Sequence, residues 1–182
     1  TVLRESLVIL RYLDGLFAQA PVAQQDPLRH AMENLLVSHE RDFADAGYRL
    51  LMNRDPARRD ALMQALLAQY ARLDAELCRI DELHRQHTAA EASTPWLWDR
   101  FGWAEAVYTP LFMRFWCLGY YEGFELPEEA RYARVREWQA AFADYRRYHE
   151  YMRINRSMNL AEFKEIYYPE YFHRLFGRLI AL

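Results

Sequence analysis

Two kinds of residue pair in this sequence could carry chemistry, and the first stands where an apolar helix begins. Glu5 and Ser6 open the run SLVILRYL. A helix N-terminus offers free N–H groups and the positive end of the helix dipole, which suit an anionic group. Ser6 can equally be an ordinary helix cap, with Glu5 a favourable acid beside it. The residues alone leave both interpretations open.

The second kind of pair is an acid three residues before a histidine, a spacing that di-iron helical bundles use. The chain contains Glu170-x-x-His173 and one aspartate analogue, Asp81-x-x-His84. A di-iron centre also needs two further carboxylates that face the same cavity, and the sequence offers no evident candidates. We therefore predict no metal site.

Arginines and tyrosines alternate between residues 131 and 156, a mixture that can bind single-stranded RNA. Acidic side chains dilute this pattern, among them Glu137, Asp144 and Glu150. The net charge of −3 also argues against a nucleic-acid partner. A solvated helix face with alternating charges is the better interpretation, and we predict no binding to nucleic acid.

The elements that must position these residues are helices. Glycine and proline are absent from residues 57–94 and 128–168, and no hairpin signal separates alternating apolar runs. Apolar residues instead recur at steps of three and four. We predict an all-α bundle of six or seven helices, over residues 6–15, 27–50, 56–84, 103–118 and 128–151, with one or two more in 160–182.

Composition sets the compartment that we expect. No stretch of the 182 residues approaches the ~18 apolar residues of a membrane span, and no signal-peptide pattern opens the chain. Cys78 and Cys117 lie far apart in apolar helical patterns, which is typical of reduced, buried thiols. These features predict a cytoplasmic protein with no membrane partner.

Several motifs, taken in order, resemble the glutathione S-transferase family. Residues 3–13 resemble the junction between its two halves, where an acid–serine pair opens a helix. Residues 102–105, GWAE, and Pro110 resemble the capped start and the proline of its buried central helix. A tryptophan-bearing helix follows, with Trp138. The resemblance covers roughly residues 3–150, and it departs at two positions: Gly102 replaces serine or threonine, and Glu105 replaces aspartate.

The resemblance implies a domain organisation. Residues 1–17 would be the last strand and helix of a thioredoxin-like domain, residues 18–27 a linker, and residues 28–182 an all-helical C-terminal domain. In this family the thioredoxin-like half supplies the catalytic residue. The resemblance therefore names no catalytic residue within this chain, and it implies that the chain alone is inactive.

The resemblance also implies a function and a site. The intact protein would be a homodimeric enzyme that binds glutathione as co-substrate and transfers it to, or reduces with it, a small hydrophobic electrophile. Glu5 and Ser6 would bind glutathione. The electrophile's pocket would lie between two helices and be lined by His39, Phe43, Tyr48, Tyr108, Phe112 and Trp116. Core packing explains the same six residues equally simply.

Helical domains that resemble this one also dock proteins in transcription or translation complexes. A non-catalytic docking module is therefore the alternative function. Glu5 and Ser6 favour the enzyme, because a docking domain has no use for that pair.

Overall fold

The computed structural model describes residues 3–16, 21–87 and 94–143. Within these ranges it contains α-helices and short 3-10 helices and no strand, which confirms the predicted all-α class. The elements are α1 (Ser6–Leu16), α2 (Pro27–Ser38), α3 (Glu40–Leu51), the 3-10 helix η1 (Pro56–Arg58), α4 (Arg59–His87), α5 (Trp103–Arg114), α6 (Trp116–Glu122), the 3-10 helix η2 (Ala130–Tyr132) and α7 (Ala133–Ala143).

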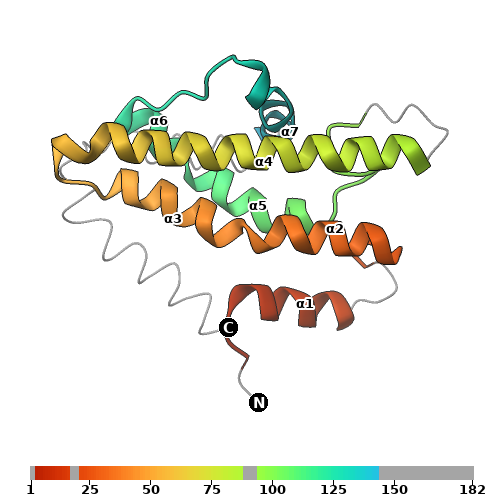
Figure 1. The fold of residues 1–182 in the computed structure, drawn as a ribbon. Helices are drawn as coiled ribbons and strands as arrows, with labels where there is room; N and C mark the ends of the chain where they lie inside the picture. The colour runs from red at the N-terminus through yellow and green to blue at the C-terminus, as the bar shows by residue number, and fades with distance from the viewer. Residues whose placement is uncertain (1–2, 17–20, 88–93, 144–182) are drawn as a thin grey trace.

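Helices α2 and α3 follow each other along one line in Figure 1. The predicted start is confirmed: the Asp26 side chain accepts a hydrogen bond from the Arg29 amide, and Pro27 is the first helical residue. The predicted single helix to residue 50 is wrong at His39, where φ −88° and ψ −7° end α2. Leu36 and Phe43 on either side both remain buried. The pattern of buried apolar residues therefore continues across the break, and this pattern could not predict where α2 ends.

Helix α4 is the longest element and runs alongside α2 and α3 (Figure 1). Its 29 residues correspond to about 43 Å at 1.5 Å per residue. Asp55 accepts a hydrogen bond from the Ala57 amide and starts η1, as the Asp-Pro pattern predicted. Its buried side chains include Leu66, Tyr70, Leu73, Leu77 and Ile80.

Helix α5 forms the buried centre that its sequence predicted, with Ala104 and Tyr108 both fully buried. The predicted continuation to residue 118 is interrupted at Phe115, which separates α5 from α6. A Cβ atom on Gly47 of α3 would lie only 2.3 Å from the Phe115 ring. The Phe115 ring thus occupies the space that a side chain at position 47 would need. This contact with α3 occurs at the residue that separates α5 from α6.

Helix α7 packs on α4 and α5. Of the residues predicted to face inward here, Tyr132 of η2 and Val135, Trp138 and Phe142 of α7 are all buried, with Val135 and Trp138 fully so. Tyr145, the rest of the helix predicted to residue 151, and the predicted helices of residues 160–182 lie outside the described residues. The proposed division into residues 1–17, 18–27 and 28–182 stays a prediction.

Candidate functional site

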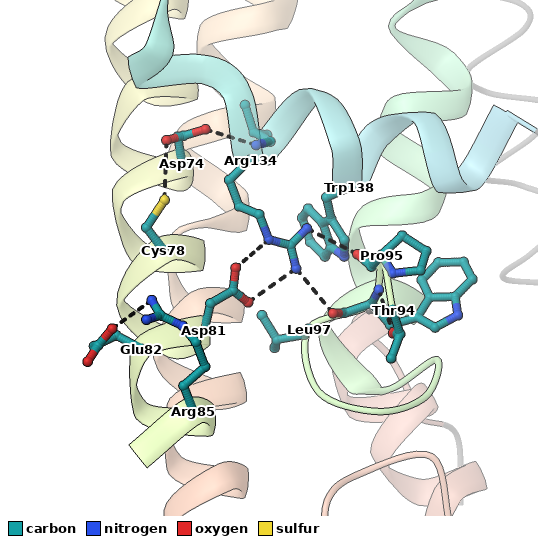
Figure 2. Close-up of polar contacts among 12 residues, drawn as sticks. Asp74, Cys78, Asp81, Glu82, Arg85, Thr94, Pro95, Leu97, Arg134 and Trp138 are labelled. Carbon is teal, nitrogen blue, oxygen red and sulfur yellow. Dashed lines mark hydrogen bonds and ion pairs between the residues drawn. The ribbon is translucent and has the colours of Figure 1, made fainter. Parts of the chain in front are cut away.

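Four acidic side chains lie near the start of α7 and the start of α5. One of them, Asp81, forms an ion pair with Arg134 (Figure 2). Its carboxylate binds the Arg134 guanidinium at two points, with Nε to Oδ2 at 2.6 Å and Nη2 to Oδ1 at 3.2 Å. The same guanidinium donates to the carbonyl oxygens of Pro95 and Trp96, each at 3.1 Å. Arg134 therefore joins α4, the segment before α5 and α7.

About two turns earlier on α4, Asp74 binds the backbone of α7. Its Oδ1 accepts a hydrogen bond from the Val135 amide at 2.9 Å, and its side chain is buried. The first amides of a helix have no partner within the helix, so Asp74 satisfies one of them. The Cys78 thiol lies 3.7 Å from the other Asp74 oxygen (Figure 2).

Glu105 reaches α7 from α5 and is fully buried. Its Oε1 accepts hydrogen bonds from the Leu97 amide and from the Trp138 indole N–H, both at 2.8 Å. Its Oε2 accepts from the Gly102 amide at 2.9 Å. The glutamate that resembled a family cap thus accepts hydrogen bonds from two segments, the one before α5 and α7.

Glu33 of α2 is the fourth acid and is also fully buried. It accepts hydrogen bonds from the Gln24 amide at 3.2 Å and the Trp103 amide at 3.3 Å. Burial, with a smaller contribution from the nearby charge of Glu105, raises the pKa of Glu33 to about 7, although the two amide donors oppose the shift. A Cβ atom on Gly102 would lie 2.5 Å from Glu33 Oε1. This close approach explains why glycine stands there.

The structure brings together several of the residues predicted to line a pocket. The rings of Phe43, Tyr108 and Phe112 contact one another at centroid distances of 5.8 to 6.0 Å. The Tyr108 hydroxyl donates to the Leu36 carbonyl at 2.9 Å, and burial raises the pKa of Tyr108. These rings lie between α3 and α5, as predicted, and they pack as core side chains. A substrate-binding role stays a prediction.

The other three predicted pocket residues lie around this cluster. Tyr48 packs edge-on against Phe115 at 5.7 Å, whereas Trp116 is buried beside Tyr120 and Tyr121. His39 is half-buried at the break between α2 and α3. Burial lowers the pKa of His39, and the positive charge of Arg72 adds to this effect.

Helix α1 lies on the opposite side of the molecule from α7 (Figure 1), and Glu5 and Ser6, where it begins, are exposed. Ser6 is the first residue of α1, and Glu5 before it has a positive φ of 69°. The Glu5 carbonyl oxygen accepts the first helical hydrogen bond, from the Ile9 amide at 3.0 Å. A ligand-binding role for this pair stays a prediction.

The two thiols are poor nucleophiles, because burial raises the pKa of Cys117 to about 12 and also raises that of Cys78. Cys117 is buried as predicted, whereas Cys78 is exposed, contrary to the prediction. No group of three or more metal-binding side chains occurs in the part of the chain that the structure describes. Asp81 is paired with Arg134, and Glu170 and His173 lie outside the described ranges.

Comparison with known proteins points to a family through the C-terminal part of the chain. Residues 131–182 match the model of the cytochrome oxidase assembly protein family COX15-CtaA. Over 46 residues, 25% of the chain, it is 50% identical to heme A synthase COX15 of Bos taurus and 48% identical to heme A synthase of Paramagnetospirillum magneticum. Over 45 residues it is 53% identical to heme A synthase of Rickettsia felis. These matches span 11 to 13% of the relatives' own length.

This finding overturns the resemblance to glutathione S-transferases and the function drawn from it. The match is to heme A synthases, so neither glutathione transfer nor the docking alternative is supported, and glutathione as co-substrate is wrong. The physical reason lies in the motifs. A capped helix start, a proline-bearing buried helix and a buried tryptophan are local devices that any helical protein can use.

The predicted partners and location are wrong on the same finding. The predicted partners were glutathione, a small electrophile and a second copy of the same chain. The matched relatives are heme A synthases, so these partners are not supported. The predicted cytoplasmic location without a membrane partner is wrong on this match, because the COX15-CtaA heme A synthases are integral membrane proteins. No helix in the described ranges is long and apolar enough to cross a membrane.

Proposed function

We propose that this chain contributes a heme-contacting segment to heme A synthesis for cytochrome oxidase, and that the segment is residues 131–182. The single observation that supports this is the match of those residues to the COX15-CtaA family. The matched part is a small fraction of a heme A synthase, so the proposal concerns heme contact by this chain and not turnover by it alone.

Histidine is the most suitable heme ligand in the matched range. An imidazole nitrogen holds the iron in many heme proteins, and residues 131–182 contain two histidines, His149 and His173. We propose that His173 is the residue that ligates the heme iron. One or two helices are predicted over residues 160–182, with an interruption at Pro169, and a helix that begins after Pro169 would place Glu170 on the same face, three residues earlier. A carboxylate there can accept the second ring N–H of a ligating histidine and orient the imidazole.

Titration of the purified full chain with hemin tests this proposal. We expect saturable binding with one heme per chain. The shift of the heme absorption band measures this binding. His173→Ala should weaken the affinity by about tenfold or more, since it removes the iron ligand. His149→Ala should keep the affinity close to that of the wild type.

The matched control is His30→Ala, because His30 is an exposed histidine on α2 and lies outside the matched range. It should leave hemin binding unchanged. The proposal would be overturned by an absence of saturable binding, or by an equal loss of affinity in His173→Ala and His30→Ala.

A further inference from the structure

We propose that Glu33 and Glu105 together form a proton-binding site, and that loss of its proton loosens the contact between α2 and the start of α5. The proposal is independent of heme binding, because it concerns residues outside the matched range 131–182.

The geometry places two buried carboxyl groups in one space. Glu33 comes from α2 and Glu105 from α5, and both are fully buried. Glu33 Oε1 and Glu105 Oε2 lie 2.5 and 3.2 Å from the point where a Cβ atom on Gly102 would stand. Two carboxylates so placed repel each other strongly when both are ionised, because little water separates or screens them. One proton shared by the pair removes that repulsion.

The hydrogen bonds indicate which carboxyl group carries the proton. Glu105 accepts three hydrogen bonds of 2.8 to 2.9 Å, so both of its oxygens already have close N–H donors. Glu33 accepts two longer ones, of 3.2 and 3.3 Å. Glu105 Oε2 has one of its three donors and Oε1 has the other two. The proton therefore belongs on Glu33.

Gln24 supplies a second, independent indication of the site. Its side chain is 7% exposed, and its Nε2 has no hydrogen-bond partner among the described residues. That nitrogen lies 3.7 Å from the same point beside Gly102. A buried amide donor without an acceptor is costly, and it is available to a carboxylate oxygen once the proton leaves.

The charged groups around the pair come from each neighbouring element. Arg100, in the segment before α5, is the cation that favours the ionised form of Glu33. On α2, Arg29 faces Asp99 at 3.8 Å. On α1, Arg11 lies over the Trp103 ring, and Asp14 accepts from the Val22 amide at 2.6 Å. Within the described residues, no arginine forms an ion pair with Glu33, so its charge is not neutralised locally.

The direction of the pH effect follows from the raised pKa. Burial and Glu105 raise the pKa of Glu33 from the ordinary 4.5 to about 7 in the folded chain. The folded protein then holds a proton that the unfolded chain releases between these two values. The contribution of this site to stability is greatest below pH 4.5 and is lost as the pH rises through about 7. The full effect on the folding equilibrium constant is at most about 300-fold.

Urea unfolding of the full chain between about pH 5 and about pH 8 tests the proposal. Wild type should lose stability as the pH rises, by up to roughly 70-fold in the folding equilibrium constant over this range. Glu33→Gln, which cannot ionise, should lose most of that pH dependence. The control Glu125→Gln changes an exposed loop glutamate and should keep the wild-type dependence. Equal pH dependence in wild type and Glu33→Gln would overturn the proposal.

A second measurement needs no variant and covers the case in which Glu33→Gln does not fold. Infrared difference spectra of wild type across the same pH range should show one protonated carboxyl group that disappears near pH 7. Amide exchange at Gln24 and Trp103 should accelerate over the same range beyond the intrinsic effect of pH. A spectrum with no protonated carboxyl signal near neutral pH would contradict the proposal.

Discussion

Replacing Glu105 with alanine is expected to lower the free energy of unfolding by about 4 kcal/mol. The substitution removes the acceptor of three hydrogen bonds and leaves the Leu97 amide, the Gly102 amide and the Trp138 indole N–H without it. Each buried donor left unsatisfied costs about 1–3 kcal/mol. Relief from burying a charged group offsets part of the sum. Since a domain has about 5–15 kcal/mol in total, this loss would remove a large part of the protein's stability.

Urea unfolding followed by tryptophan fluorescence measures this loss. Glu137→Ala is the matched control, because Glu137 is an exposed glutamate on α7 next to Trp138. It should change the free energy of unfolding by less than about 0.5 kcal/mol. A loss below about 1 kcal/mol for Glu105→Ala would mean that the three donors find other acceptors or water.

Replacing Asp81 with alanine is the second large expected effect, a loss of about 2–3 kcal/mol. The side chain of Arg134 is only 10% exposed, so the guanidinium would remain buried without its anion. Asp81 itself is 32% exposed, and water can therefore partly replace it. This exposure places the effect below the ~3–5 kcal/mol cost of breaking a fully buried pair.

Glu82, next to Asp81 in the sequence, offers a control whose distance to its arginine partner is the same. Glu82 lies 2.6 Å from Arg85, as Asp81 does from Arg134, but both side chains of that pair are at least half exposed. Glu82→Ala should cost less than about 0.5 kcal/mol. In a double-mutant cycle, Asp81→Ala and Arg134→Ala should couple by about 1–2 kcal/mol. Additive losses would show that the two side chains act independently.

Local chemistry in the sequence was sufficient to predict where helices begin. Asp26-Pro27 and Asp55-Pro56 both start helical segments, because an aspartate cap and a proline at the first position act within a few residues. The ends inside long apolar patterns could not be predicted in the same way. The breaks at His39 and Phe115 keep the buried face continuous, and the second accompanies a contact with Gly47 on another helix.

The candidate site was hidden from the sequence for a related reason. Glu33 and Asp74 are ordinary acids in amphipathic patterns, and only the packed fold shows that both are buried. The one local signal was Gly102 with Glu105, which departs from the usual cap. The structure explains this departure, because Glu33 Oε1 occupies the space that a Cβ atom at Gly102 would need.

The family assignment failed because its evidence was spread over residues 3–150, in motifs that serve helix formation generally. The matched residues 131–182 were instead interpreted as a charged helix face and a final helix. The family match rests on the identity of individual side chains in these residues. Apolar periodicity and charge patterning do not use that information. The structure adds that the start of this range is held in the core by Asp74, Asp81 and Glu105.

Hydrogen–deuterium exchange of the full chain with and without hemin tests the proposed function most directly, because it locates the contact. The account predicts that hemin slows amide exchange within residues 131–182 and leaves α1 to α4 unchanged. Slower exchange confined to α1 to α4, or no change anywhere in the chain, would contradict the proposal that residues 131–182 contact heme.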